Sequence, residues 1–283
     1  MNDIIEIQNN ELVANVSSQI NAINDFIAWA DAHLQDSRRD ETFKNLINVR
    51  RKLKRLCFSL ERNPAIAAFG ESQKGKSYVI SSLLARQGQQ FMVTDPITGE
   101  VYNFVEQLNP LTRDTEATGV ATCFTSYYEV PDKHYPVLIN VLSVADVLQI
   151  LCDTAYNDVN RHSIIDQEDI DEFMQALERR YKGAPRVQSY LDEDDVMNIR
   201  QYVEEHIGGA KAKELLDSCF FDVLARIVPK VQPREWSQIM SKMWYDNSDI
   251  TRLFVGLLRG YETLSFSNRV YIPISALLNT TTT

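Results

Sequence analysis

Apolar residues recur at three- and four-residue intervals along the first sixty positions of the chain, which is the spacing of one face of an α-helix. This pattern predicts one helix from Leu12 to Leu34 and a second over 40–61. The two helices are expected to pair as a hairpin. The recurring apolar positions are Val16, Ile20, Ile23, Ile27 and Leu34 on the first helix, and the expected core face of the second is Phe43, Leu46, Ile47, Leu53, Leu56 and Leu60.

Beyond residue 63 the pattern changes to short apolar runs separated by turn residues, which is typical of strands. A Pro- and Gly-containing turn at 94–99 is expected to join two of them. Residues 78–86 keep helical spacing instead. The expected inner positions of that helix are Val79, Ile80, Leu83 and Leu84, and the predicted strands are 64–69, 90–93, 100–105, 123–130 and 136–142.

From Ser143 onward the spacing is helical again. Ser143 is a suitable N-cap with Asp146 in the first turn, and Asp166 is expected to cap a helix ending near Tyr181. Trp236, Trp244, Tyr245 and Phe254 are expected in the core of this helical part, and a returning strand is expected over 269–273. The further predicted helices are 192–209, 210–228, 233–244 and 249–261.

These elements predict an α/β fold with an incomplete P-loop NTPase-type sheet, an N-terminal helical hairpin and a large all-helical insertion. The expected division is a hairpin at 1–62, the first part of a nucleotide-binding core at 63–142, the helical insertion at 143–263, and the returning strand and tail of the core at 264–283.

The charge balance narrows the expected partners. The 283 residues carry a net charge of −10, and an acidic chain is a poor general binder of nucleic acid, because neutralising phosphates requires clustered cations. No apolar run reaches the length of a membrane span, and the N-terminus lacks the pattern of a signal peptide. We expect a cytoplasmic protein, with peripheral attachment to a membrane as the alternative.

Cysteine and histidine usage indicates no metal or disulfide framework. The four cysteines are far apart and form no C-x-x-C pair, so reduced thiols are expected. The four histidines are equally scattered, and no zinc site is expected. These residues are Cys57, Cys123, Cys152 and Cys219, and His33, His134, His162 and His206.

The most informative stretch lies between the predicted strand at 64–69 and the helix at 78–86. It fits G-x-x-x-x-G-K-[ST], the phosphate-binding loop. Its glycines permit a close backbone approach, and its amides with the helix start can converge on a phosphate. The expected nucleotide-binding residues are Gly70, Glu71, Ser72, Gln73, Lys74, Gly75, Lys76, Ser77 and Tyr78.

A basic cluster lies on the second predicted helix. It could face acidic lipid or nucleic acid. A solvated helix face, or a complement to acidic surface of the same chain, is the interpretation we favour. The cluster consists of Arg50, Arg51, Lys52, Lys54 and Arg55.

Residues 68–77 resemble the phosphate loop of bacterial dynamin-like GTPases, and residues 118–122 resemble their switch I. This resemblance implies that Thr122, with Thr118 as second choice, closes over Mg²⁺ and the γ-phosphate. Stretches 135–147 and 271–277 also resemble a family of bacterial virulence factors with a dynamin-like N-terminal region. The implied ligands are GTP, or else ATP, and Mg²⁺ held by Ser77 and Thr122.

The chain departs from the GTPase pattern in two places. It has no D-x-x-G, which holds the Mg²⁺ shell, and no [NT]-K-x-D, which reads guanine. We therefore expect the N-terminal part of a longer protein, with little hydrolysis unless a missing C-terminal region is present. A divergent nucleotide binder is the alternative.

Other polar groups have two interpretations each. Arg113 could stabilise transition-state charge as an arginine finger or anchor its loop by a salt bridge. Glu71 could approach a bound water or simply face solvent, and Gln73 could help compensate charge. The acids at 192–195 lack the spacing of a calcium loop and are better explained as a helix start.

The leading hypothesis is Mg²⁺-dependent nucleotide binding, with Lys76, Thr122 and Arg113 as the catalytic residues. Lys76 would neutralise phosphate charge, and Thr122 would position the attacking water. The rivals are an ATP-using enzyme, either an ATPase or a kinase, and a non-catalytic module. In that module the helical insertion binds a protein partner and the loop is vestigial.

Overall fold

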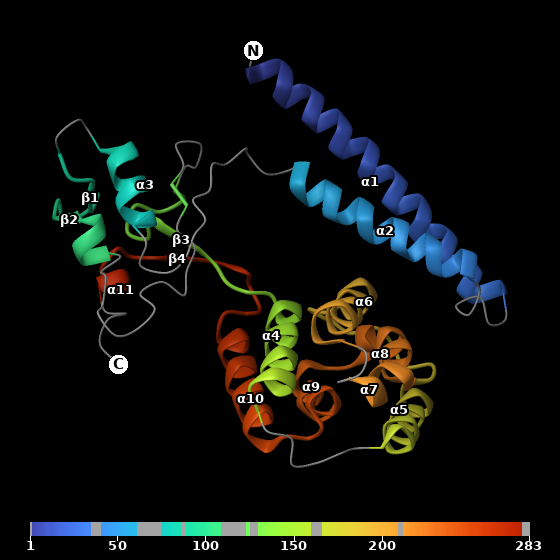
Figure 1. Ribbon diagram of the computed structural model, residues 1–283. Helices are drawn as coiled ribbons and strands as arrows, with labels where there is room; N and C mark the ends of the chain where they lie inside the picture. Colours follow the sequence, from blue (N-terminus) through green and yellow to red (C-terminus); the bar gives the residue numbers. More distant parts are fainter. Residues whose placement is uncertain are drawn as a thin grey trace. The chain divides into compact units, whose positions relative to one another are not determined.

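The computed structural model describes residues 2–34, 41–60, 75–85, 89–108, 123–124, 130–159, 166–208 and 212–278. The chain divides into two compact units, Met1–Ile66 and Ala67–Thr283. Figure 1 shows the helices and strands of both units.

The first unit is a helical hairpin. Helix α1 (Asn2–His33) and helix α2 (Glu41–Leu60) run antiparallel beside each other (Figure 1). Their core contains Ile27 and Ala30 from α1 and Phe43 and Ile47 from α2. The two predicted helices are therefore confirmed, and α1 begins earlier than the apolar pattern indicated.

The contact face of α2 differs from the prediction. Arg50 and Arg51 of the basic cluster are buried, whereas Leu56 is exposed. Arg50 Nη1 donates a hydrogen bond to Asn24 Oδ1 at 3.3 Å, and Arg51 Nη1 donates to Asn48 Oδ1 at 3.0 Å. The expectation of a solvated face is wrong for these two residues, and the bond from Arg50 to Asn24 of α1 shows that α2 turns part of its basic side toward the hairpin contact.

The first part of the second unit holds short elements. Helix α3 (Lys76–Leu84) is followed by a hairpin of β1 (Met92–Thr94) and β2 (Val101–Asn103) and by η2 (Phe104–Leu108), a π-helical turn. Strands β3 (Val137–Asn140) and β4 (Arg269–Ile272) pair antiparallel, with Val137 opposite Ile272, and the short helix α11 (Ser275–Leu278) follows β4.

The predicted P-loop NTPase-type sheet is wrong. The described strands form two separate antiparallel ribbons, β1–β2 and β3–β4, and no parallel pair occurs among them. A P-loop sheet needs parallel strands joined by helical crossovers. Here the tight turn at 95–99 folds β2 back onto β1, and among the described residues each ribbon has two strands. The predicted strand 64–69 and residues 125–129 of the predicted strand 123–130 lie outside the described residues.

The larger part of the second unit is helical and lies in sequence between β3 and β4. Its most buried large side chains include Trp236, Trp244, Phe220 and Phe254, and Tyr245 is also buried. The predicted core role of the four aromatic residues from 236 to 254 is therefore confirmed. The elements are α4 (Val144–Asn157), α5 (Gln167–Tyr181), α6 (Glu193–Tyr202), η3 (Val203–Gly208), α7 (Lys213–Asp217), α8 (Phe220–Ile227), η4 (Val228–Lys230), η5 (Pro233–Glu235), α9 (Trp236–Met240), η6 (Ser241–Trp244) and α10 (Ser248–Thr263).

The predicted caps are present. Ser143 and Asp146 form a reciprocal capping box on α4, and the Asp166 side chain caps α5. Asp192 and Asp195 form a second capping box on α6. The acidic run at 192–195 is thus a helix start, as the sequence indicated.

The single helix predicted over 210–228 is wrong, because the chain breaks between α7 and α8. Ser218 Oγ donates to the carbonyl of Leu215 at 2.8 Å and accepts from the Phe220 amide at 3.2 Å. The Cys219 amide donates to Asp171 Oδ1 of α5 at 2.6 Å. These side chains form hydrogen bonds with backbone amides and carbonyls that would pair with each other in a continuous helix. One helix therefore ends here and the next begins.

Candidate functional site

The start of α3 contains the described part of the predicted phosphate loop. Gly75 has φ +85° and ψ 13°, a left-handed backbone conformation, and α3 begins at the next residue. A Cβ built on Gly75 would meet nothing within 4 Å, so backbone conformation rather than space favours glycine. An L-residue in this conformation costs about 1–2 kcal/mol.

The N-terminus of α3 is arranged to suit an anion. The N-cap residue is Gly75, which has no side chain to cap the helix, and the first turn holds no acidic residue. The first intrahelical hydrogen bond runs from the Val79 amide to the Gly75 carbonyl at 3.0 Å. The first-turn amides and the positive end of the helix dipole lie at this end of α3, which is an arrangement that favours an anion.

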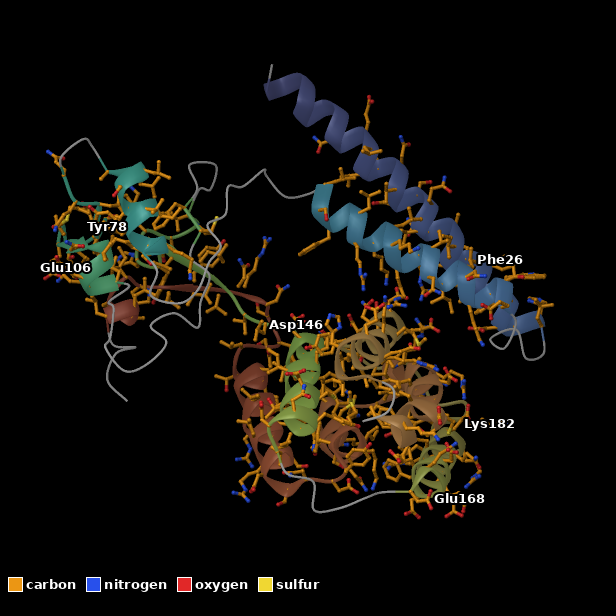
Figure 2. The ribbon with its side chains drawn as sticks, in the orientation of Figure 1. Phe26, Tyr78, Glu106, Asp146, Glu168 and Lys182 are labelled. Atoms are coloured by element: carbon orange, nitrogen blue, oxygen red, sulfur yellow. The ribbon has the colours of Figure 1, made fainter. Side chains whose placement is uncertain are left out.

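Lys76 and Ser77 occupy the first turn, and both are half-buried. A cation at a helix N-terminus opposes the helix dipole, at a cost of roughly 0.3–1 kcal/mol. A bound phosphate would reverse this cost, since it would lie between the amides and the ammonium group. Tyr78, labelled in Figure 2, is 71% exposed.

The structure brings together four of the predicted site residues, Gly75, Lys76, Ser77 and Tyr78, in one helical turn. The remaining ones lie outside the described residues, so their predicted roles stay predictions. They are Gly70, Glu71, Ser72, Gln73 and Lys74 of the loop, and Arg113 and Thr122 of the threonine-rich segment.

The apolar side of α3 differs from the prediction. Leu83 is 73% exposed, Val79 and Leu84 are also exposed, and Ser81 is the buried residue of the helix. A helix of a P-loop fold is covered by its parallel sheet. Here α3 instead contacts the small π-helical turn η2, which leaves most of its apolar side uncovered.

The buried thiol of Cys152 and the half-buried thiol of Cys219 are not activated as nucleophiles. Burial raises the pKa of Cys152 well above its usual range. Burial and then the Asp171 carboxylate raise the pKa of Cys219 to about 12. Because the thiolate is the reactive form, neither side chain is activated at neutral pH.

Among the described residues no group of three or more His, Cys, Asp or Glu side chains could hold a metal ion. No helix in the same part of the chain is long and apolar enough to cross a bilayer.

Sequence reasoning missed an apolar groove on the hairpin, lined by Phe26, Leu34 and Val49 among others. The signal was present as a second apolar stripe on α2, at 42, 46, 49, 53, 56 and 60. Its leucines fit the contact with α1 equally well, so helical spacing alone does not separate the two stripes.

The described fold and site define a largely helical protein that presents a glycine-lysine-serine helix start. Comparison with protein families adds the assignment: the profile of the family described as putative bacterial virulence factor matches residues 16–283. The chain belongs to this family. Neither the curated proteins nor the solved structures contain a match.

Proposed function

We propose that residues 70–78 bind the phosphates of a nucleotide together with Mg²⁺, and that the nucleotide is GTP. The observation that carries the proposal is the left-handed Gly75 placed directly before a helix whose first turn holds Lys76 and Ser77 and no acidic residue. This local geometry suits a phosphate. It does not require the parallel sheet that the described strands lack.

Each residue has a distinct task in the proposed complex. Lys76 neutralises charge on the β- and γ-phosphates, and the Ser77 hydroxyl is a Mg²⁺ ligand. Thr122 completes the Mg²⁺ contacts and positions water, and Arg113 adds positive charge opposite the transferring phosphoryl group. Bound Mg²⁺ would supply further neutralisation of phosphate charge.

The preference for GTP follows from the resemblance of residues 68–77 and 118–122 to dynamin-like GTPases. Since the sequence has neither D-x-x-G nor [NT]-K-x-D, phosphate contacts dominate over base contacts. We expect measurable binding with weak discrimination between GTP and ATP, and slow hydrolysis by these 283 residues.

Binding of a fluorescent GDP analogue, measured with and without Mg²⁺, tests the proposal. We expect Lys76→Ala to weaken binding by at least about tenfold, or about 1.4 kcal/mol. Ser77→Ala should remove most of the Mg²⁺ dependence. Lys133→Ala is the matched control, because Lys133 is exposed and lies outside the loop; it should bind as wild type does.

Equal, negligible binding by wild type and Lys76→Ala would contradict the proposal. Stronger binding of an ATP analogue than of its GTP counterpart would contradict the choice of base alone.

A second candidate function is a protein-binding module with a vestigial loop. The exposed Val79 and Leu83 on α3 favour it, since a pair of exposed apolar side chains on one helix suits a protein contact. In that case Leu83→Lys would abolish partner binding, whereas Lys76→Ala would leave it unchanged.

A further inference from the structure

Helix α2 has two apolar stripes at coiled-coil spacing, and α1 covers mainly one of them. The inner stripe contains Phe43 and Ile47, together with the buried Arg50. The second stripe, one position earlier along the helix, is more apolar. It consists of Thr42, Leu46, Val49, Leu53, Leu56 and Leu60.

The second stripe is incompletely covered. Val49 is 47% and Leu56 is 45% exposed, and Leu46, Leu53 and Leu60 are half-buried. A helix with two adjacent apolar stripes can contact two neighbours at once, as helices of a four-helix bundle do. The hairpin supplies one neighbour for α2.

Helix α1 repeats this arrangement. Its inner stripe includes the buried Val16, Ile27 and Ala30. Next to it, at the same spacing, Leu12, Phe26 and Trp29 are 45–50% exposed. The outer stripe of α1 is mixed. Leu12, Ala22, Phe26 and Trp29 are apolar, whereas Asn15, Gln19 and His33 at the same spacing are polar.

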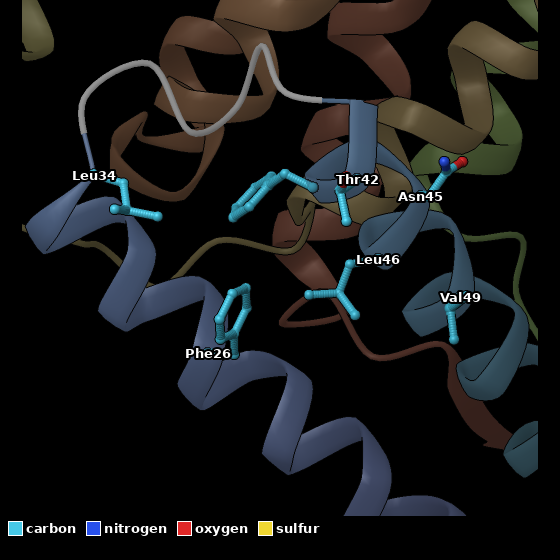
Figure 3. A pocket seen from close by; sticks show the side chains of 7 residues that line it. Phe26, Leu34, Thr42, Asn45, Leu46 and Val49 are labelled. Carbon is cyan, nitrogen blue, oxygen red and sulfur yellow. The ribbon is translucent and has the colours of Figure 1, made fainter.

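A groove lies where Phe26 of the α1 outer stripe approaches the second stripe of α2. Figure 3 shows its walls, with Phe26 from α1 and Leu34 just after α1 on one side and Leu46 and Val49 from α2 on the other. The cavity between them has a volume of about 490 Å³. Leu56 continues the same stripe of α2 beyond the cavity.

The charges of the two helices restrict what can cover this groove. Helix α1 carries five Asp or Glu and no Lys or Arg, whereas α2 carries six Lys or Arg and one Glu. An anionic lipid surface would attract α2 and repel α1 alongside it. A second hairpin of the same sequence, by contrast, offers an acidic helix for α2 and a basic helix for α1.

We propose that a second copy of this chain covers the groove, so that two hairpins form an antiparallel four-helix bundle. Two copies can place their grooves against each other by two-fold symmetry in two ways, which differ in the direction of the symmetry axis. An axis parallel to the helices places α1 of one copy on α2 of the other. An axis across the helices places acid on acid and base on base, so the charges select the parallel axis.

Rotation about this axis does not move a residue along the helix direction. The register within one hairpin therefore also shows which residues of the two copies lie at the same level. The hairpin register is given by Arg50 bonding Asn24 and by Cys57 contacting Ser17 at 3.6 Å, one heptad further along. In this register the heights of Asp25 in one copy and Lys52 in the other, measured along the bundle axis, differ by less than about one helical turn, or roughly 5 Å. Both side chains are exposed in the single chain.

Sedimentation velocity of the 283-residue chain tests the proposal. Wild type is expected to show twice the 32.5 kDa mass of one chain. The double variant Val49→Glu, Leu56→Glu should sediment as a monomer with unchanged helical circular dichroism. The control Leu253→Glu changes an equally exposed leucine of α10 and should stay dimeric.

The charge pair tests the axis and does not depend on apolar substitutions. Asp25→Lys and Lys52→Glu should each weaken the dimer at least about threefold, and the combined variant should regain most of the loss. Additive weakening in the combined variant would overturn the proposal.

Three other results would also overturn it. One is a monomeric wild type at every concentration, including the case in which the groove is covered by the second unit of the same chain or by anionic vesicles. The second is a dimer that persists in the Val49→Glu, Leu56→Glu variant. The third is equal dissociation of the Leu253→Glu control.

Discussion

At the scale of single residues, backbone conformation and local hydrogen bonds decide most of what the described site can do. Gly75 is the example: its left-handed conformation turns the chain into α3. Lys76 and Ser77 follow it in the same turn, so their positions depend on that one conformation. The motif in the sequence predicted this order because it depends on consecutive residues.

Asp95 provides a residue-scale prediction. Its Oδ1 accepts hydrogen bonds from the amides of Ile97 at 2.8 Å and Thr98 at 3.0 Å in the turn between β1 and β2. The Thr98 amide first, and then that of Ile97, hold the pKa of Asp95 below its usual 3.8. Because the folded pKa is the lower one, this stabilisation is complete above pH 3.8 and is lost as pH falls through the folded value.

Carboxyl NMR titration of Asp95 should therefore give a pKa below 3.8 in the folded chain, with the Ile97 and Thr98 amide shifts following the same transition. In Asp95→Asn these amides should not titrate over that range. A value at or above 3.8 would contradict the turn geometry.

At the scale of elements, capping and apolar spacing explain which helices were predicted well. The start of α4 is fixed by Ser143 Oγ, which accepts from the Asp146 amide at 3.1 Å, while Asp146 Oδ2 accepts from the Ser143 amide at 2.9 Å. Both partners are three residues apart, so the sequence alone indicated them. The break between α7 and α8 was missed because the hydrogen bond from the Cys219 amide goes to Asp171, 48 residues away.

The capping box of α4 leads to the element-scale prediction. Ser143→Ala should lower the free energy of unfolding by about 1 kcal/mol, because it removes the acceptor for a helix N-terminal amide. Urea denaturation measures this change. Ser248→Ala is the matched control, since Ser248 is exposed and follows Asn247, the residue that caps α10.

A loss in Ser248→Ala as large as that in Ser143→Ala would show that the effect is not specific to the cap.

Helix α2 shows the limit of spacing arguments. Its apolar residues satisfy two helical stripes, and the sequence does not say which one faces α1. In the structure Arg50 takes a buried position with Asn24 as its partner, and Leu56 remains exposed. The choice is made by the length and polarity of the facing residues of α1.

At the scale of the whole molecule, strand pairing was the least predictable feature. Strands β3 and β4 are separated by the whole helical part yet pair with each other, and the Val141 amide continues the ribbon to the Asn268 carbonyl at 2.9 Å. The sequence predicted both strands. It could not show that they pair antiparallel in a ribbon of two, because nothing local encodes the partner of a strand.

Tyr261 connects the two ends of the helical part and leads to the whole-molecule prediction. Its hydroxyl on α10 donates a hydrogen bond to the carbonyl of Leu142, just before α4. Tyr261→Phe should lower the free energy of unfolding by about 1 kcal/mol, since it leaves that carbonyl without this donor. Tyr135→Phe, at an exposed tyrosine, is the control.

The same hydroxyl makes this contribution pH-dependent. Burial first, and then the Asp146 carboxylate, raise the pKa of Tyr261 above its usual 10.0. The stabilisation is therefore complete below pH 10.0 and is lost as pH rises through the folded value. The difference between wild type and Tyr261→Phe in urea denaturation should shrink in alkaline solution, and a constant difference would contradict this origin.

The sequence by itself determined the features that depend on near neighbours: the hairpin helices, the caps at Ser143, Asp166 and Asp192, the Asp95 turn region and the order of Gly75, Lys76 and Ser77. The tertiary structure decided which stripe of α2 faces α1, where the 210–228 helix breaks, and that the described strands form two antiparallel ribbons. Capping and helical periodicity act within a few residues and are written in the local sequence. Strand partners and buried faces depend on contacts between distant segments. Alternative pairings and alternative buried faces differ in energy only when the chain is packed.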